Sequence, residues 1–511
     1  MATGSARMRL AIVGGGASAV TLVDALARST PREKIKVSIF EPRADPGPGR
    51  PYQQDADGAL INRPAEAMSI RHTEPLDFRN WLREAGNRGE FPSVDPEARF
   101  QPRWLFGVYL RRRLASAAAR LAAGGSTVET SESTVEDVLP VDGGLRILTS
   151  TGVTQTNDHV VMCLGTPRPA DLYGLSGRPG FVADPYPLAG PLPADEPVTV
   201  LGSNLSAVDI AVALLRRGHT APVRLMSRNG ALPSVRCRPA VILPDEAREL
   251  AEAVRRTPSA ALWTTVRRLL RARLAAHGAS ADEMVRDLAV GEPAAGRLTR
   301  QLGRQDAEDC WRAVLLPLLD PVGELFWQRL PPRTRQSFLG RHHTRLATVL
   351  NPMPPATAAL LLEALRTGAL EVHAGVTAVT ARPTGGFTVT ADGRDHHAGV
   401  LLNAVRATPY DPEEPAGRLL ARLTASGLVR PHPCGGVYVD FATNRVLGPA
   451  PGLYALGHPT AGDLYYANAG SLLGISARAE RIVARILSSP VTGAAAVAHS
   501  STLTIGGRLD G

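Results

Sequence analysis

Two short turns, far apart in the chain, have the residue types and spacing that bind a dinucleotide. The first has the pattern G-x-G-x-x-A from Gly14 to Ala19, and the second runs from Gly202 to Ala207 with Asn204 in place of the central glycine. An apolar strand is expected before each turn and a helix after it. Glycine lets a pyrophosphate approach the backbone, and the free N–H groups at the start of a helix attract its charge. The two turns together predict that one chain holds two dinucleotides.

An acidic residue follows the first turn at a distance that suits a ribose. Glu41 ends the next apolar strand, 22 residues after Ala19, and a carboxylate there accepts hydrogen bonds from both ribose hydroxyls. Because an acid there disfavours a 2′-phosphate, we expect FAD here and not NADP. The alternative interpretation is an ordinary glycine-rich turn in an α/β protein. The expected FAD contacts in this half are Gly14, Gly16, Ser18, Ala19, Glu41, Arg43, Val135, Gly165 and Gly457.

The second turn is followed by a different pair of side chains. Ser227 and Arg228 end the next strand, and a hydroxyl with a guanidinium suits a 2′-phosphate, which arginine binds with two parallel hydrogen bonds. We therefore expect NADPH in preference to NADH. Asn204 tolerates left-handed backbone angles better than most residues, but a degenerate site without nucleotide is the alternative. The expected NADPH contacts are Gly202, Asn204, Ser206, Ala207, Ser227 and Arg228.

A helix near the C-terminus is a third candidate for contact with a flavin. Gly470 and Ser471 precede an amphipathic run that reaches Leu487. A helix N-terminus aimed at the flavin would stabilise the negative charge of the reduced ring, and Asp463 could bind the ribityl chain. The alternative is an ordinary helix cap preceded by a loop acid.

The elements that must position these residues occur in the same order twice. This repeat predicts the α/β class, with two nested Rossmann-like three-layer domains for FAD and NADPH, β-meanders and an inserted helical region. The expected strands are 9–13, 36–41 and 223–226, the helices 18–28 and 206–217, and the meanders 127–139 with 145–151 and 376–382 with 386–391.

The expected domains are discontinuous in the sequence. The helical segment is rich in arginine and either covers the active site or forms a solvated cap without contact to substrate. Its helices are expected at 260–275, 281–288, 307–318 and 355–366. We predict an FAD-binding domain at 1–170 and 395–490, an NADPH-binding domain at 171–238 and 371–394, the helical insertion at 239–370 and a tail at 491–511.

Composition argues against several classes of partner. The 511 residues carry a net charge of +9, but 48 acidic residues are interspersed among the basic ones, and no nucleic-acid-binding motif accompanies the charge. No stretch approaches ~18 uninterrupted apolar residues. The short segment before the first strand leaves no room for a signal peptide, so we expect a cytoplasmic protein.

The four cysteines are Cys163, Cys237, Cys310 and Cys434. They show no C-x-x-C spacing and no Cys/His cluster. This excludes the redox dithiol of a flavin-dependent disulfide reductase, and no metal is expected.

The chain resembles the two-dinucleotide-binding FAD/NAD(P) oxidoreductases. Within them it is similar to the bacterial branch related to flavin-dependent N-hydroxylating monooxygenases, which includes the nitrosuccinate synthases. The likeness covers most of residues 8–235 and 395–487. Residues 49–52 and 59–69 are similar to the family's segment that crosses the flavin. Residues 75–82 and 102–110 are similar to two of its helical motifs, and residues 202–209 with 227–230 are similar to its NADPH site.

The resemblance implies an FAD- and NADPH-dependent monooxygenase of secondary metabolism. It would N-hydroxylate a small, aspartate-like amino acid or a primary amine through a C4a-hydroperoxyflavin, which bound NADP⁺ would protect. The implied partners are a small-molecule substrate and O₂, with no nucleic acid and no membrane, and a homo-oligomer stays open. Two alternatives also stay open: an NADPH-dependent flavin reductase or dehydrogenase without oxygen insertion, and a non-catalytic nucleotide-binding regulator.

Two of the candidate residues for the reaction lie in these motifs, and the others lie outside them. Asn62 and Met68 are expected beside the flavin ring, and Arg406 stands where the family usually has Thr-Gly, so it is expected to project toward flavin or substrate. These three are the predicted catalytic residues. His72 could equally be a surface histidine. The predicted substrate-binding residues are Arg71, His72, Tyr465 and Asn468.

Overall fold

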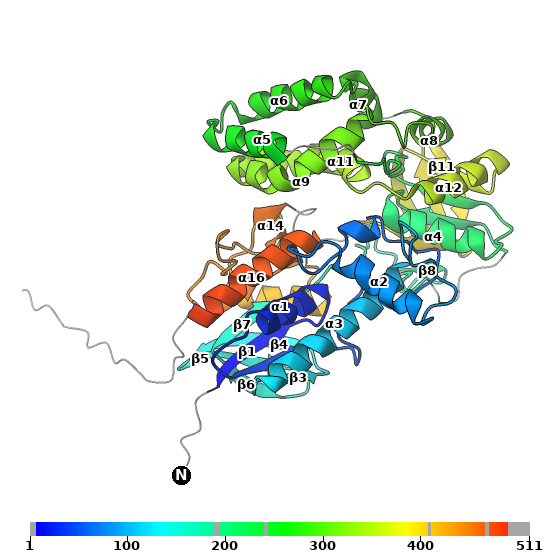
Figure 1. Cartoon of the computed structure of the whole chain (residues 1–511). Coiled ribbons are helices and arrows are strands. Elements are labelled where there is room, and N and C mark those ends of the chain that lie inside the picture. Colours follow the sequence, from blue (N-terminus) through cyan, green and yellow to red (C-terminus); the bar gives the residue numbers. More distant parts are fainter. Residues whose placement is uncertain are drawn as a thin grey trace, which may run out of the picture.

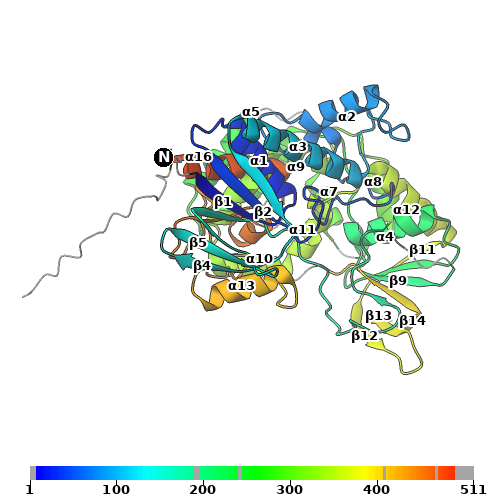
Figure 2. The same ribbon diagram turned by 90° about the horizontal axis from the view of Figure 1, so that it is seen from below.

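The computed structural model describes residues 7–188, 190, 195–239, 244–289, 291–406, 410–465 and 470–488. Two five-stranded parallel sheets form the centres of two units, and a further group of helices covers one side of the molecule (Figure 1). In the view from below, the two sheets lie beside each other (Figure 2). The predicted α/β fold with two Rossmann-like units and an inserted helical region is confirmed.

The first unit has strand order β16-β7-β1-β2-β3. Its inner strands are mostly apolar because both faces of the sheet are buried. Leu10 and Ile12 pack against the helices α1, α3 and α16, while Ala11 and Val13 face the antiparallel sheet β4–β6 and helix α13. The elements are β1 (Met8–Val13), α1 (Ala17–Arg28), β2 (Ile35–Phe40), α2 (Asp77–Asn87), α3 (Arg103–Ala123), β3 (Thr127–Ser131), β4 (Val135–Val141), β5 (Gly144–Thr149), β6 (Thr154–Asn157), β7 (His159–Met162), α13 (Pro415–Ala425), β16 (Leu453–Ala455), α14 (Ala461–Leu464) and α16 (Leu472–Ser488).

The second unit repeats this plan with strand order β11-β10-β9-β15-β8. Val198 and Val200 pack against the helices, and Leu201 and Leu401 face the three-stranded antiparallel sheet. The elements are β8 (Phe181–Val182), β9 (Val198–Leu201), α4 (Leu205–Arg216), β10 (Val223–Met226), α8 (Ala294–Leu302), α12 (Pro355–Thr367), β11 (Leu370–His373), β12 (Val376–Ala381), β13 (Phe387–Ala391), β14 (Arg394–Ala398) and β15 (Val400–Asn403).

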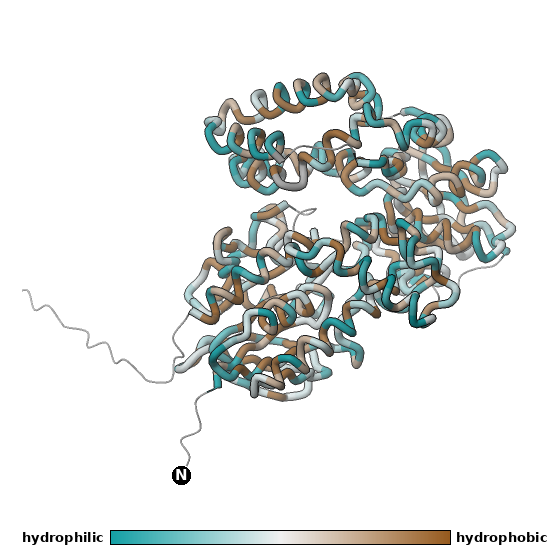
Figure 3. Tube along the Cα trace, viewed as in Figure 1, coloured by the Kyte–Doolittle hydropathy of each residue, from teal (hydrophilic) through white to brown (hydrophobic). Residues whose placement is uncertain are grey.

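The helical cap is the group α5, α6, α7, α9, α10 and α11. It has its own apolar core, in which Val254, Leu262, Val314, Leu318 and Trp327 are buried. Apolar and polar residues alternate along its outer helices, whereas apolar residues concentrate inside the first unit (Figure 3). The cap helices are α5 (Pro244–Arg256), α6 (Leu262–Ala276), α7 (Ala281–Leu288), α9 (Trp311–Arg329), α10 (Pro332–Arg341) and α11 (His343–Leu350).

Two sequence expectations about the sheets are wrong. The segment 127–139 is not one arm of a meander, because β3 joins β2 in the parallel sheet and only β4 enters the antiparallel one. The boundary at residue 395 is also misplaced, since β14 pairs with β13 and β15 pairs with β9, both in the second unit. The return to the first unit therefore follows Asn403.

The inserted helical region is shorter than the predicted 239–370. Helix α12 packs on α8, α4 and β11, so it belongs to the second unit. Helix α9 begins at Trp311, later than the predicted 307, and continues to Arg329. Among the described helices, none is long and apolar enough to cross a membrane.

Candidate functional site

The first turn is held in a conformation that only glycine adopts without strain. Gly14 has φ of +98°, and a Cβ there would lie 2.3 Å from the carbonyl oxygen of Cys163. Gly16 is the N-cap of α1, so the first N–H groups of that helix, which have no partner within it, lie next to the turn. This backbone fits a dinucleotide pyrophosphate.

Glu41 lies directly at this turn, as its position in the sequence predicts. Its carboxylate accepts a hydrogen bond from the Gly15 N–H at 2.7 Å and one from the Arg43 N–H at 3.3 Å. The Arg43 side chain itself is exposed. A buried acid beside the turn fits the ribose of FAD, and these residues together fit an adenine dinucleotide.

The other predicted FAD contacts divide into two groups. Gly457 faces Ser18, because a Cβ on Gly457 would lie 2.6 Å from the Ser18 hydroxyl oxygen. Gly165 is exposed where the chain leaves β7. Ala19 and Val135 are buried, and their side chains pack in the two cores of the first unit.

The second turn repeats the first in detail. Gly202 has φ of +123°, and a Cβ there would lie 2.7 Å from the carbonyl oxygen of Ala404. The Ser203 hydroxyl lies 2.8 Å from the Ser227 hydroxyl. Ser227 therefore occupies in this unit the place that Glu41 has in the first, as the sequence predicts.

The reason given for tolerating Asn204 is wrong. Asn204 is the N-cap of α4 with φ of −90° and ψ of −171°, which is extended backbone that any residue adopts. Its side chain accepts a hydrogen bond from the Leu205 N–H at 2.9 Å. Ser206 and Arg228 are exposed near this turn, while Ala207 is buried in the core of the second unit.

A cavity of about 1380 Å³ lies where the two units and the helical cap meet. Its wall includes Leu205, at the start of α4, and Gly470 and Ser471, just before α16. Asn62 and Met68 line it as well. The second turn and the C-terminal helix thus open into one chamber, which a transfer between two dinucleotides requires.

The first turn connects to this cavity through the segment that follows Gly47. The Gly47 N–H donates to the Gly15 carbonyl at 2.7 Å, and Gly49 lies against Gly16. Only a few residues later, Pro51 and Tyr52 are part of the cavity wall. This segment is therefore a path along the chain from the first turn to the cavity wall.

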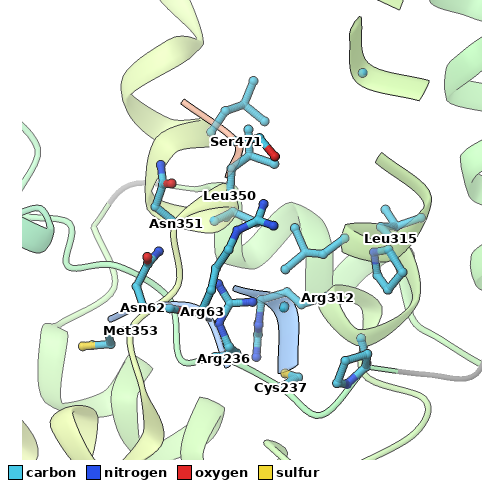
Figure 4. A pocket seen from close by; sticks show the side chains of 18 of the residues that line it. Asn62, Arg63, Arg236, Cys237, Arg312, Leu315, Leu350, Asn351, Met353 and Ser471 are labelled. Carbon is cyan, nitrogen blue, oxygen red and sulfur yellow. Dashed lines mark hydrogen bonds between the residues drawn. The ribbon is translucent and has the colours of Figure 1, made fainter. Parts of the chain in front are cut away.

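Positive charge dominates the described part of the cavity wall, which carries eight arginines and three acids. Figure 4 shows Arg63, Arg236 and Arg312 gathered between Asn62 and Leu315. The wall arginines are Arg63, Arg99, Arg103, Arg236, Arg238, Arg267, Arg271 and Arg312, and the acids are Glu66, Asp209 and Asp306. The chamber therefore suits an anionic ligand.

Several of these arginines are fixed by neighbours. Arg103 forms an ion pair with Asp209 at 3.0 Å, and Arg312 pairs with the buried Asp287. The Arg236 Nε donates to the carbonyl oxygen of Asn62 at 2.6 Å. Arg236 thus ties the second unit to the segment predicted to lie beside the flavin.

Arg71 and His72, predicted to bind substrate, have partners away from the described cavity wall. The Arg71 guanidinium forms two 2.9 Å hydrogen bonds with the buried carboxylate of Asp24, and this bonding raises its pKa above the usual range. His72 lies 3.3 Å from the Ser476 hydroxyl and faces Glu480 on α16. Both side chains serve packing of α1, α2 and α16, and neither lies on the described cavity wall.

Two other predicted residues, Tyr465 and Arg406, both lie near the buried His343. Tyr465 lines the cavity, and its hydroxyl lies 3.1 Å from Nδ1 of the buried His343. Burial, together with the positive charge of Arg406, lowers the pKa of His343 to about 4, and burial raises that of Tyr465 to about 12. Arg406 therefore lies near this pair, although it is itself exposed. Asn468 falls outside the described residues.

Asp463 has partners that do not suit the predicted ribityl contact. One carboxylate oxygen accepts from the Val439 N–H at 2.8 Å, and the other lies 3.8 Å from His432 Nε2 and 4.0 Å from Arg335 Nη1. Within the described residues, no cluster of three or more His, Cys, Asp or Glu is placed to bind a metal.

Sequence reasoning missed Arg63, Arg236, Arg312 and His343 as parts of this site. Arg63 lies within the segment 59–69 that carried the resemblance, so its neighbour Asn62 could have pointed to it. Arg312 and His343 belong to the helical cap, whose sequence has no motif that marks a binding side chain.

Comparison with known proteins agrees with this geometry. The FAD-NAD(P)-binding family matches residues 11–167. An ornithine N-hydroxylase from Kutzneria sp. 744, solved with reduced FAD, NADP⁺ and L-ornithine, is similar over 94% of this chain and 99% of its own, with 16% identity and a TM-score of 0.55. No curated protein matches the chain by sequence.

Two further solved structures have the same fold. L-lysine 6-monooxygenase from Pseudomonas syringae is 13% identical, with a TM-score of 0.53, over 94% of this chain and 99% of its own. The cadaverine monooxygenase of desferrioxamine biosynthesis from Erwinia amylovora, solved with FAD, is 12% identical, with a TM-score of 0.53, over 98% and 99%.

These similarities confirm the resemblance predicted from the motifs at the level of the fold. The chain shares its two-unit architecture with these three solved structures, and the FAD-NAD(P)-binding family model matches residues 11–167, within its first unit. At identities this low, a shared fold does not assign a reaction.

Proposed function

We propose that this protein is an FAD- and NADPH-dependent monooxygenase that hydroxylates the nitrogen of a small amino acid, aspartate-like, or of another primary amine. The observation that carries the proposal is the single cavity onto which the start of α4, the start of α16 and the segment 60–68 all open. Three enzymes of this fold act on ornithine, lysine and cadaverine, all of which are amines.

The first unit supplies the FAD site in this proposal. Gly14, Gly16 and Ser18 would hold the pyrophosphate at the start of α1, and Glu41 would hold the ribose. FAD, when bound, accepts a hydride from NADPH and activates O₂. Asn62 and Met68 would flank the ring, because both lie on the cavity wall at the end of the path from the first turn.

The N-terminal end of α16 would act on the charge of the reduced ring. Gly470 and Ser471 bring this end to the cavity wall. A helix N-terminus carries a partial positive charge, and it would favour an anionic ring at the cavity wall. The chain thus contributes orientation and electrostatics to the proposed reaction.

The second unit would hold NADPH through Ser227 and Arg228. Ser227 is already positioned by its contact with Ser203 at 2.8 Å. The exposed Arg228 follows it at the carboxyl end of β10, where a 2′-phosphate is bound in folds of this type. Exposure leaves this guanidinium accessible to a phosphate.

The arginines of the cavity wall support a substrate that carries a carboxylate. Arg63 and Arg236 flank Asn62, and Arg312 faces them from the cap (Figure 4). A carboxylate bound by one guanidinium through two hydrogen bonds places the amine of a small amino acid at a fixed distance from it. The apolar cap residues Leu315, Trp327 and Phe338 would exclude water from the amine.

The remaining assignments follow from the sheets and the side chains. We assign 7–170 and 406–488 to the FAD-binding domain, 171–238, helix α8 and 351–405 to the NADPH-binding domain, and the helices α5, α6, α7, α9, α10 and α11 to the cap. Four free cysteines suit a reducing compartment such as the cytoplasm.

A single assay tests the proposed reaction. FAD-loaded protein is mixed with NADPH in air, with and without L-aspartate, L-ornithine, L-lysine and cadaverine, and O₂ uptake, hydrogen peroxide and hydroxylamine product are measured. We expect one carboxylate-bearing amine to raise O₂ uptake and to yield hydroxylamine in place of peroxide. Peroxide release equal to NADPH consumption with every amine would favour the flavin reductase.

A further inference from the structure

Two cysteines that are far apart in the sequence meet at the wall of the cavity. The Sγ atoms of Cys237 and Cys310 lie 2.8 Å apart, and both residues are thiols. Cys310 is fully buried, while Cys237 is 5% exposed and lines the cavity, beside Arg312 (Figure 4). They are 73 residues apart, so no sequence spacing of the C-x-x-C type could reveal the pair.

The backbone on both sides holds this pair in place. The residues that flank Cys237 donate their N–H groups to other segments, Arg236 to the Met353 carbonyl at 2.9 Å and Arg238 to the Gln305 carbonyl at 2.8 Å. Cys310 is the N-cap of α9. The two sulfurs therefore meet because two rigid parts, the loop after β10 and the start of a cap helix, are packed together.

Charge around the pair favours a thiolate on one of the two sulfurs. Hydrogen bonding from Cys237 lowers the pKa of Cys310 to about 6, assisted by Arg312 and by the N–H groups at the start of α9. The same contact raises the pKa of Cys237. Thiolates at helix N-termini beside a guanidinium are the reactive form of cysteine.

We propose that Cys237 and Cys310 form a reversible disulfide that links the second unit to the helical cap at the cavity wall. The oxidant is hydrogen peroxide or another small peroxide, which is close to water in size and enters through the cavity at Cys237, whose Sγ lies 2.8 Å from that of Cys310. The proposal concerns the thiols alone and does not depend on the proposed monooxygenase reaction.

The reaction balances as a two-electron oxidation of the pair. The Cys310 thiolate attacks one peroxide oxygen, the O–O bond breaks, and the released hydroxide takes up a proton to become water, leaving a sulfenic acid on Cys310. The Cys237 sulfur then attacks the Cys310 sulfur, the S–O bond breaks, and a second water leaves with the Cys237 proton. Two thiols are oxidised to one disulfide while one peroxide is reduced to two waters, and a dithiol reductant reverses the change.

The cross-link would change both the mobility of the cap and the charge beside it. Arg312 lies between these sulfurs and the carboxylate of Asp287. Oxidation removes the thiolate from this group, so that of Cys237, Cys310 and Asp287 only Asp287 still places a negative charge beside the guanidinium. The loop with Arg236 becomes covalently joined to the helix that carries Arg312.

Peptide mass spectrometry tests the proposal on the full-length protein. Reduced protein is treated with a small molar excess of hydrogen peroxide, alkylated under denaturing conditions, digested and analysed. We expect a peptide pair joined through Cys237 and Cys310, two hydrogen atoms lighter than the sum of its parts, which dithiothreitol abolishes. The matched control, Cys434→Ser, removes a half-buried cysteine and should leave the cross-link intact.

A second measurement guards against a variant that fails to fold. In wild-type protein, the oxidised form should melt a few degrees above the reduced form, because the link restricts the unfolded chain. Cys237→Ser and Cys237→Ala should lose this shift while Cys434→Ser keeps it. Sulfinic acid at either residue without any cross-link, or identical melting of oxidised and reduced wild type, would overturn the proposal.

Discussion

Arg236 links two parts of the site through one side chain. Its Nε donates to the carbonyl oxygen of Asn62 at 2.6 Å, and its side chain lines the cavity together with Arg63. A guanidinium has five donors in a fixed fork, so it can hold this loop and still present N–H groups to an anion. Arg236 is therefore the residue on which the proposed carboxylate specificity depends most.

Arg236→Met should weaken substrate binding and leave the cofactor half-reaction intact. Loss of a hydrogen bond to a charged group costs about 1.5–3 kcal/mol, so we expect KM for the preferred carboxylate-bearing amine to rise roughly 10–100-fold. Steady-state O₂ uptake measures KM. Arg168→Met, at an exposed arginine outside the described cavity wall, is the control. A parallel fall in the rate of flavin reduction by NADPH would contradict this assignment.

His343 gives stability a pH dependence with a definite sign. Burial and Arg406 lower its pKa from the ordinary value of 6.5 to about 4 in the folded state. Between these values the unfolded chain binds a proton that the folded protein does not, so stability falls as the pH falls from 6.5 to 4. The expected loss is about 3 kcal/mol.

His343→Gln should flatten this part of the stability profile, because glutamine does not titrate. Urea unfolding followed by circular dichroism at pH 7, 6, 5 and 4 measures the effect. His72→Gln, which changes a partly exposed histidine in the turn before α2, should keep the wild-type slope. The interpretation fails if His343→Gln and wild type lose stability in parallel.

For single residues, the sequence predicted positions that a nearby motif fixes, but it did not predict contacts between residues far apart in the chain. Glu41 could be predicted because the end of the second strand always lies beside the glycine turn. The role of Arg71 could not be predicted, because its partner Asp24 is on helix α1, 47 residues away in the sequence, and nothing in the local sequence marks the pair. The same limit hid Arg312 and the thiol pair.

The two strand–turn–helix elements share one geometry with different chemistry. In each, a glycine with positive φ faces a carbonyl oxygen of the neighbouring strand end, Cys163 in the first and Ala404 in the second. The difference lies in the side chain at the next strand end, a carboxylate in Glu41 and a hydroxyl in Ser227. In the proposed assignment, element geometry provides two dinucleotide sites, and the side chains at these strand ends select the ligand.

Gly14→Ala should prevent FAD binding and destabilise the first unit. A methyl group would meet the Cys163 carbonyl at 2.3 Å, in addition to the strain of φ at +98°. Gly143→Ala is a matched control, since Gly143 also has positive φ but nothing within 4 Å of its Cβ position, and it should cost only about 1–2 kcal/mol. The FAD-to-protein absorbance ratio and thermal melting measure both effects. Normal FAD content in Gly14→Ala would refute the role of this turn.

Arg228→Ala should reduce the preference for NADPH over NADH. Removing a guanidinium from a 2′-phosphate loses a charge-assisted hydrogen bond, so we expect the affinity for NADPH to fall at least about tenfold while the affinity for NADH stays the same. Isothermal titration with each nucleotide measures this. Arg394→Ala, on the exposed edge of the second meander, should change neither. Equal losses for both nucleotides would place the 2′-phosphate elsewhere.

The positions of helices and strands were predicted well where a regular spacing of apolar residues or a glycine turn marks them. The helix at 281–288 and the strand at 223–226 match α7 and β10 to the residue. Strand pairing was harder, because β3 and β4 are both short alternating segments and only the sheet decides which one pairs with β2. Helices α10 and α11 were missed because polar and apolar residues are interspersed in their sequences without a clear helical spacing. Only packing in the cap shows which face of each helix is apolar.

In the whole molecule, the two repeated units and the helical cap surround one chamber. Neither glycine turn predicts the cap. The duplicated order of elements predicted two units, and their relative placement came only from the fold. The cavity of about 1380 Å³ exceeds the usual range of a small-ligand pocket, about 300–1,000 Å³, and so leaves room for a nicotinamide and a substrate beside a flavin ring. The cap supplies apolar cover and Arg312, and the units supply Asn62, Arg63 and Arg236.

The most direct measurement mixes the FAD-loaded protein with NADPH in the absence of oxygen and follows the flavin absorbance. If both dinucleotides meet in the shared chamber, the yellow colour bleaches in a single rapid phase, faster with NADPH than with NADH, and it returns when air is admitted. A protein that takes up FAD but keeps its oxidised spectrum under saturating NADPH would contradict the account.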